Sequence, residues 1–145
     1  MPLPFTDLAR YIANLFDQCA NRPAPLLATR AEIGNYGERV AAAFLWRRGY
    51  RVLYHNYRTE RGEIDLICRS GELLVFVEVR TRSTEEFGRP AESIDIDKQE
   101  SVRSAALHYL ELLQREDLYY RFDVVEVVLQ AGKIPVCTLH PGFFT

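Results

Sequence analysis

The first 29 residues of the chain divide into an apolar-periodic stretch and a proline-containing stretch. In residues 1–20, apolar side chains recur at helical spacing behind a potential N-cap at Thr6, which predicts an amphipathic helix. Two prolines, Pro23 and Pro25, then interrupt the pattern, because prolines two residues apart cannot continue a helix. We therefore expect an N-terminal helix over 1–20, followed by a linker over 21–29.

Helical periodicity returns between Arg30 and Arg48, and Gly49 supplies a C-terminal stop. Two glycines, Gly34 and Gly37, lie inside this predicted helix. Each costs up to about 1 kcal/mol relative to alanine at a helical position. The two glycines therefore indicate either the close approach of another backbone or a helix that begins later than Arg30.

Three strand-like stretches follow, over Tyr50–Asn56, Glu63–Arg69 and Glu72–Arg80, and Ser70-Gly71 separates the last two. This arrangement predicts a β-hairpin. The run Leu73–Val77 is apolar throughout and shows no alternation, which is typical of a strand covered on both faces. We expect this strand to be central in a sheet.

The second half of the chain begins with a polar stretch from Thr81 to Ile96, which predicts a loop bordering a site. A helix is then predicted over Asp97–Arg115, and two strands over Arg121–Leu129 and Ile134–Leu139. The order ααβββαββ implies an α/β fold with a mixed central sheet flanked by helices. Residues 30–145 are expected to form this one domain.

The predicted hairpin determines which charged side chains share a face of the sheet. With a two-residue loop, Asp65 lies opposite Phe76, and Glu63 lies opposite Glu78. Side chains alternate between faces along a strand, so both acidic residues of the first strand share a face with Glu78 and Arg80. The other face is expected to carry the apolar residues Ile64, Leu66, Val75, Val77 and Val79.

Asp65 and Glu78 are the candidate metal ligands on the charged face. Their backbones are expected to lie roughly 7 Å apart, within reach of a shared ligand. Converging carboxylates next to water suit a hard cation, and Mg²⁺ binds through one or two carboxylates plus waters and phosphates. We therefore predict a site for Mg²⁺ or Mn²⁺, with Arg80 placed to hold a phosphate or to orient water. The alternative is an ionic cluster in which arginines only neutralise the carboxylates.

Two further residues are candidates for the same site. Glu38, on the second helix, adds a third carboxylate if that helix packs on the charged face, and is otherwise an exposed helix residue. Lys98 begins the third helix, where backbone amides favour anions, and it is one of only two lysines in the chain. It either contacts phosphate or is solvated.

The composition indicates an ordinary globular protein of 145 residues, of which 48% are hydrophobic and 26% are charged. No stretch approaches the roughly 18 apolar residues of a membrane span. Three scattered cysteines indicate neither a disulfide framework nor a zinc site. We expect a cytoplasmic protein with no membrane partner.

The net charge of −2 is not typical of a nucleic-acid-binding domain, which usually carries a basic excess. However, 16 of the 18 basic residues are arginine, and arginine favours bidentate contacts with phosphate. We predict Arg58, Arg61 and Arg82 as contacts to nucleic acid. The alternative for each is a solvated position with ordinary ion pairs.

Several motifs resemble those of known families. Asp65, a gap of twelve residues and Glu78-x-Arg80 resemble the D…(D/E)-x-K signature of the restriction-endonuclease-like nuclease superfamily. A longer set of motifs, spread over about residues 30 to 130, resembles the bacterial YraN-like family of uncharacterised proteins. These motifs are Gly34-x-x-Gly37-Glu38, Asn56-x-Arg58, Gly62-Glu63-Ile64-Asp65, Phe76-Val77-Glu78-Val79-Arg80, Lys98 and Arg121-Phe122-Asp123-Val124.

The resemblance implies a restriction-endonuclease-like fold, similar to Holliday-junction resolvases and tRNA-splicing endonucleases. It places Glu38, Asp65 and Glu78 in the metal-ligand positions. Arg80 stands where the nuclease signature has lysine, and arginine stays protonated, so it cannot act as a general base but can stabilise charge in a transition state. Lys98 is the candidate for the missing ammonium group.

These observations together predict a divalent-metal-dependent nuclease, a phosphodiesterase that acts on structured DNA. Asp65, Glu78, Arg80 and Lys98 are its predicted catalytic residues. The alternative is a non-catalytic nucleic-acid-binding or adaptor domain that retains the nuclease fold. Because resolvase-like domains often act as dimers, analogy leaves a homodimer open.

Overall fold

A computed structural model of the chain describes residues 22–83 and 94–145. The helix predicted over 1–20 lies outside these residues, as does most of the loop predicted after β3. Within them, helices and strands follow the predicted order: α2 (Arg30–Arg47), β1 (Arg51–Arg58), β2 (Glu63–Ser70), β3 (Leu73–Ser83), α3 (Ile96–Leu113), β4 (Tyr119–Leu129) and β5 (Val136–Phe144).

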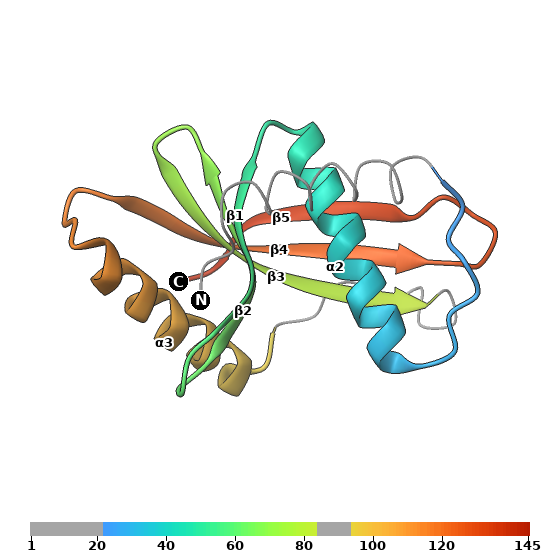
Figure 1. Cartoon of the computed structure of the whole chain (residues 1–145), viewed down its shortest axis with the longest axis horizontal. Helices are drawn as coiled ribbons and strands as arrows, with labels where there is room; N and C mark the ends of the chain where they lie inside the picture. The colour runs from blue at the N-terminus through green and yellow to red at the C-terminus, as the bar shows by residue number, and fades with distance from the viewer. Residues whose placement is uncertain (1–21, 84–93) are drawn as a thin grey trace.

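The five strands form one mixed sheet in the order β1-β2-β3-β4-β5 (Figure 1). Neighbouring strands are antiparallel except for β3 and β4, which pair in parallel from Leu73–Tyr119 to Ser83–Leu129. Parallel strands need a long crossover connection, and the segment containing α3 provides it. The predicted central strand, β3, is the third of the five, so this prediction is confirmed.

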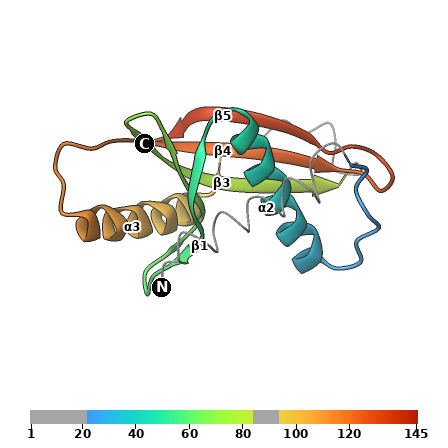
Figure 2. The ribbon, with the colours of Figure 1, turned by 45° about the horizontal axis from the view of Figure 1, so that its top comes forward.

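Two hydrophobic clusters cover the two faces of β3. Val75 and Val77 pack in one cluster with the buried side of α2, whereas Leu74 and Phe76 pack in the other with α3. Alternate residues of a strand point to opposite faces, so the uninterrupted apolar run supplies both clusters at once. The two helices lie at opposite ends of the long strands (Figure 2). Neither helix of the described residues has the length and apolar character needed to cross a membrane.

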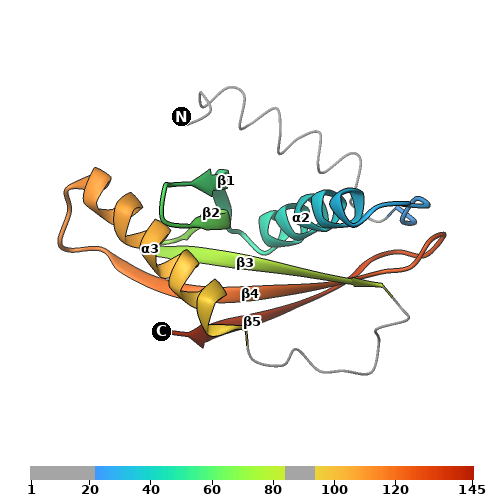
Figure 3. The same ribbon diagram turned by 90° about the horizontal axis from the view of Figure 1, so that it is seen from below.

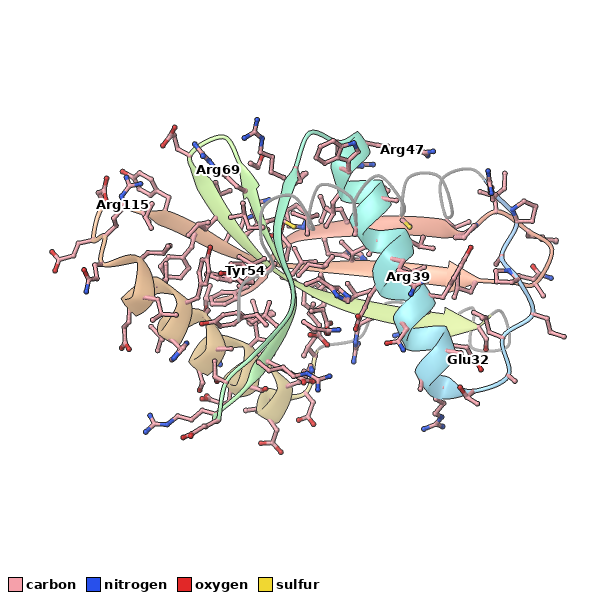
Figure 4. All side chains as sticks on the ribbon, viewed as in Figure 1. Glu32, Arg39, Arg47, Tyr54, Arg69 and Arg115 are labelled. Carbon is pink, nitrogen blue, oxygen red and sulfur yellow. The ribbon has the colours of Figure 1, made fainter. Side chains whose placement is uncertain are left out.

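Helix α2 begins where the sequence predicts. The Thr29 hydroxyl accepts a hydrogen bond from the backbone N–H of Glu32, and the Glu32 side chain in return accepts one from the backbone N–H of Thr29, which forms a capping box. Figure 4 shows Glu32 near the start of this helix and Arg47 near its end. The alternative of a later helix start is therefore excluded.

The packing of α2 on β3 explains why one of the two glycines inside the helix, Gly37, is needed. A Cβ atom at this position would lie 1.8 Å from Oγ1 of Thr81 on β3, so only glycine lets the helix pack this close to the strand. The close approach is to a side chain and not to a backbone. At Gly34, by contrast, a Cβ atom would meet nothing within 4 Å.

The register of the β2–β3 hairpin differs from the predicted register. Ser70 pairs with Leu73, so the two-residue loop is Gly71-Glu72 and not Ser70-Gly71. Gly71 has φ of +60°, a conformation that glycine adopts without the steric cost borne by other residues. Continued along the strands, this register places Asp65 opposite Glu78 and no longer opposite Phe76. The strand partner of Phe76 is therefore Ile67, two residues from the predicted partner Asp65.

The ladder between β2 and β3 ends at the pair Leu66–Val77. Beyond this point β1 and β2 turn away from the layer formed by β3, β4 and β5 (Figure 3). One predicted position is wrong for this reason: Ile64 does not share the α2 face with Leu66 but packs in the α3 cluster. The two strands therefore separate beside Asp65.

The described part of the predicted linker contacts the segment between β4 and β5. Ala24 is buried, its N–H donates to the carbonyl of Lys133 at 2.8 Å, and its carbonyl accepts from the N–H of Gly132 at 2.8 Å.

With two helices against a five-stranded mixed sheet, the architecture is the predicted mixed α/β fold. It is consistent with a restriction-endonuclease-like fold.

Candidate functional site

Asp65 and Glu78 lie together where β2 separates from β3. Past the last ladder pair, Oδ2 of Asp65 accepts a hydrogen bond from the backbone N–H of Val79 at 2.8 Å. The carboxylate thus takes the place of a strand carbonyl, which fixes its position beside β3. Both side chains are buried, with only 9% of Asp65 and 7% of Glu78 exposed.

The protonation of this carboxyl pair follows from its burial. Burial raises the pKa of Asp65, and the hydrogen bond from Val79 opposes this only in part. Burial and the neighbouring Asp65 carboxyl raise the pKa of Glu78 to about 9. Without another positive charge, the two carboxyl groups therefore retain a proton at neutral pH.

One oxygen of Glu78 has no hydrogen-bond donor. Its Oε2 atom is buried and makes no hydrogen bond with any atom of residues 22–83 or 94–145. A buried carboxylate oxygen without a donor is costly, because it has lost its water and gained nothing in return. This oxygen is the strongest indication that the site is built for a ligand.

Lys98 reaches the carboxyl pair from the first turn of α3. Its Nζ lies 3.7 Å from Oε1 of Glu78 and donates a hydrogen bond to Oε1 of Glu63 at 3.2 Å. Burial lowers the pKa of Lys98, but the carboxylates of Glu78, Asp65 and Glu63 outweigh this effect and raise it. The ammonium group therefore stays charged. The sequence predicted Lys98 as a candidate but could not show that it reaches the site.

Glu38 lines the same open hollow as Asp65 and Glu78, which has a volume of about 540 Å³. We call it the carboxylate hollow. Oε2 of Glu38 lies 3.0 Å from Nε2 of His55, so a histidine of β1 holds this side chain. Among the described residues, no three His, Cys, Asp or Glu side chains gather closely enough to hold an ion together. The structure thus brings Asp65 and Glu78 together and leaves Glu38 at the wall of the hollow.

His55 was not predicted from the sequence. It precedes the Asn56-x-Arg58 motif, and Asn56 itself has a positive φ of 53°. No spacing in the chain links position 55 to Glu38, because their contact depends on how β1 lies against α2.

The predicted arginines do not form one surface. Arg80 is close enough to Glu78 for its charge to lower the pKa of that carboxyl, in opposition to the larger effect of burial. Arg82 is mostly buried and lies 3.5 Å from Oε1 of Glu126 on β4. Arg58 and Arg61 are exposed and line a second hollow of about 880 Å³, between the β1–β2 turn and the outer side of α3.

The Arg121-Phe122-Asp123-Val124 motif has a structural explanation. Asp123 is completely buried, and Arg121 donates to its two oxygens at 2.7 Å each. The N–H of Gly142 on β5 donates a third hydrogen bond to Asp123 at 2.9 Å. This charged pair joins β4 to β5 and lies apart from the carboxylate hollow.

The donor set around Asp65 and Glu78 fits a hard divalent cation. Two adjacent carboxyl groups carry the charge, and Oε2 of Glu78 still has an unused lone pair. Mg²⁺ commonly binds one or two protein carboxylates and completes its shell with waters and phosphates. Asp65 and Glu78 would hold such an ion, and Glu38 is the nearest candidate for an additional contact.

Comparison with known proteins identifies relatives over most of the described chain. A family model described as "Uncharacterised protein family UPF0102" matches residues 37–127, a stretch that contains every residue discussed around the carboxyl pair. A UPF0102 protein of Caldicellulosiruptor saccharolyticus is 41% identical over 100 residues, which are 69% of this chain and 85% of that protein. One from Alkaliphilus oremlandii is 40% identical over 114 residues, which cover 77% and 97% of the two chains. One from Syntrophus aciditrophicus is 43% identical over 97 residues, which cover 67% and 76%.

Proposed function

The chain belongs to the UPF0102 family, and from the chemistry of its carboxyl pair we propose that it is a divalent-metal-dependent nuclease that cleaves structured DNA. The observation that carries this proposal is Oε2 of Glu78, a buried oxygen without a donor beside a second buried carboxyl group. A cation that displaced the shared proton would satisfy this oxygen and neutralise the pair.

In this proposal Asp65 and Glu78 hold Mg²⁺ or Mn²⁺, and Glu38 supports the ion from α2. Such an ion, when bound, polarises a phosphoryl oxygen and lowers the pKa of a bound water. Neither Arg80 nor Lys98 acts as a general base, because arginine does not lose its proton and the neighbouring carboxylates raise the pKa of Lys98. Both residues stabilise negative charge on the scissile phosphate.

The substrate class rests on two kinds of support. Arg58 and Arg61 are exposed beside the β1–β2 turn and present guanidinium groups suited to phosphate. Arg82, the third predicted contact, is mostly buried beside Glu126 and adds nothing to this support. Structured DNA is inferred by analogy with resolvase-like domains of the same fold class. A homodimer is proposed on the same analogy alone.

A second candidate function is a nucleic-acid-binding or adaptor domain without turnover. Arg80 favours it, since this position carries lysine in the nuclease signature. The position of Glu38 also favours this second function. Glu38 does not complete a three-residue ligand set, because no three potential metal ligands gather among the described residues.

Cleavage assays on branched, flap and single-stranded DNA test the proposal directly. We expect cleavage by the parent protein in Mg²⁺ or Mn²⁺ and none in EDTA, and we expect Asp65→Ala to be inactive. Asp117→Ala is the matched control, because Asp117 is an exposed aspartate paired with Arg115 at the far end of α3. Equal cleavage by both variants would assign the activity to a contaminant.

Calorimetric titration with Mn²⁺ separates the two candidate functions. The nuclease proposal requires binding that Asp65→Ala abolishes. DNA binding by a parent protein that takes up no Mn²⁺ would leave only the non-catalytic function.

A further inference from the structure

Glu63, the first residue of β2, lies between two basic side chains. Its Oε1 accepts a hydrogen bond from Nζ of Lys98 at 3.2 Å, and its Oε2 lies 3.7 Å from Nε of Arg58. Lys98 is therefore shared by two carboxylates, because its Nζ also lies 3.7 Å from Glu78. The two contacts of Lys98 are different interactions. Its contact with Glu63 is a hydrogen bond, whereas its contact with Glu78 is a charge interaction at longer range.

The position of Glu63 is set independently of Lys98. The backbone N–H of Glu63 donates to Oγ of Ser101 at 3.2 Å, and Ser101 follows Lys98 by three residues, on the same side of α3. Gly62 packs so closely on the helix that a Cβ atom would lie 1.9 Å from the carbonyl oxygen of Ser101. The turn before Gly62 is closed by Thr59, whose N–H donates to the Gly62 carbonyl at 2.8 Å. The start of β2 is thus fastened to α3 next to Lys98.

We propose that Glu63 is a positioning residue for Lys98 in the proposed nuclease. A lysine side chain has a long, flexible stem, and a partner is needed to hold its ammonium group in one place. Glu63 takes the direct hydrogen bond and keeps the ammonium group just outside hydrogen-bond distance of Glu78. Both oxygens of Glu78 therefore stay available for a cation, while the charge of Lys98 remains at the edge of the site. The contacts between Glu63, Lys98 and Glu78 do not depend on metal or DNA. Only their consequence for metal binding rests on the proposed function.

The inference also accounts for the Gly62-Glu63-Ile64-Asp65 motif as a unit. Gly62 allows the turn to pack on α3, Glu63 holds Lys98, Ile64 enters the α3 cluster, and Asp65 supplies half of the carboxyl pair. Removal of the Glu63 charge would allow Lys98 to move onto Glu78 and to compete there with the cation.

Chemical labelling of the lysines tests the position of Lys98 without metal or DNA. Lys98 and Lys133 are the only lysines of the chain, so acetylation of each can be followed by mass spectrometry, with Lys133 as an internal reference. At fixed pH in EDTA, we expect Glu63→Gln to lower the acetylation rate of Lys98 relative to Lys133 severalfold, because the ammonium group would move onto the buried carboxyl group of Glu78. Glu100→Gln is the matched control, because Glu100 is an exposed glutamate on α3 that pairs with Arg103. An unchanged or faster acetylation of Lys98 in Glu63→Gln would overturn the proposal.

A double-mutant cycle tests the consequence for the metal site. Loss of a residue that orients a metal site typically lowers metal affinity about 10–100-fold, so we expect Glu63→Gln to weaken Mn²⁺ binding about tenfold in calorimetry. In the Lys98→Met background the same substitution should have no further effect, because Glu63 acts through Lys98. Equal effects in both backgrounds would mean that Glu63 acts by its charge alone and would overturn the positioning role. If the parent protein bound no Mn²⁺, the proposed function would fail, while the labelling result would still decide the position of Lys98.

Discussion

Replacing Glu78 by glutamine should remove a pH dependence from the stability of the fold. Burial and the Asp65 carboxyl raise the pKa of Glu78 from its ordinary value of 4.5 to about 9 in the folded protein. A carboxyl group with a raised pKa binds its proton more tightly when the protein is folded than when it is unfolded. Its stabilising effect is therefore complete below its ordinary pKa and is lost as the pH rises through the folded pKa.

The size of the effect follows from one proton. Between pH 4.5 and about 9, the folded protein holds about one proton more at this site than the unfolded chain does. The free energy of unfolding then falls by at most about 1.4 kcal/mol per pH unit. From pH 6 to pH 8 the parent protein should lose up to about 2.7 kcal/mol. This is a large part of the total of about 5–15 kcal/mol that holds a typical domain folded.

Urea unfolding in EDTA at pH 6, 7 and 8 measures this loss. Glutamine has the shape of a protonated glutamic acid but cannot ionise, so Glu78→Gln should be almost insensitive to pH over this range. Glu72→Gln, in the exposed hairpin loop, makes the same change of charge and should follow the parent protein. If the parent protein and Glu78→Gln lost stability in parallel, the pH dependence would not come from Glu78.

Three further predictions concern the metal, the helix glycines and the buried ion pair. Because a cation must displace the shared proton, the Mn²⁺ dissociation constant should fall by up to about tenfold from pH 7 to pH 8, and Asp65→Asn should bind no Mn²⁺; calorimetry that finds the same affinity at both pH values would contradict this. Gly34→Ala should stabilise the protein by about 0.5–1 kcal/mol, because its Cβ atom meets open space, whereas Gly37→Ala should destabilise it by about 1–3 kcal/mol, because its Cβ atom meets the side chain of Thr81. Equal melting temperatures of the two variants would refute the packing argument. Asp123→Ala should cost about 1–3 kcal/mol in urea unfolding, because it leaves the N–H of Gly142 without its acceptor and Arg121 without its carboxylate, and a cost below about 0.5 kcal/mol would show that the pair is dispensable.

Much of the fold could be predicted because its signals are local in the sequence. Helix α2 has its own capping residues, and the apolar run of β3 is long enough to mark a strand covered on both faces. The order of elements then leaves few arrangements other than a mixed sheet with a helical crossover. The proximity of Asp65 and Glu78 was predictable as well, because they lie on adjacent strands of one hairpin at similar distances from its loop.

The tertiary structure decided which residues of β2 and β3 pair with one another. The hairpin loop is Gly71-Glu72 and not the predicted Ser70-Gly71, and its first residue, Gly71, has the positive φ that a type II′ turn places there. This shift pairs Ile67 with Phe76, so that Asp65 comes directly after the last ladder pair, Leu66–Val77, and lies near Glu78. A local pattern cannot choose between two neighbouring loops that contain the same glycine.

The surroundings of the carboxyl pair depend on contacts between residues far apart in the chain. His55 holds Glu38, Glu63 holds Lys98, and Arg82 contacts Glu126. Each of these pairs joins two different elements, so its distance depends on how helices pack on the sheet and how far β2 turns away from β3. The sequence by itself therefore determined which residues carry charge and which strand or helix they occupy. Only the tertiary structure decided which of those charges meet, because burial and separation, on which their pKa values and ligands depend, are properties of packing.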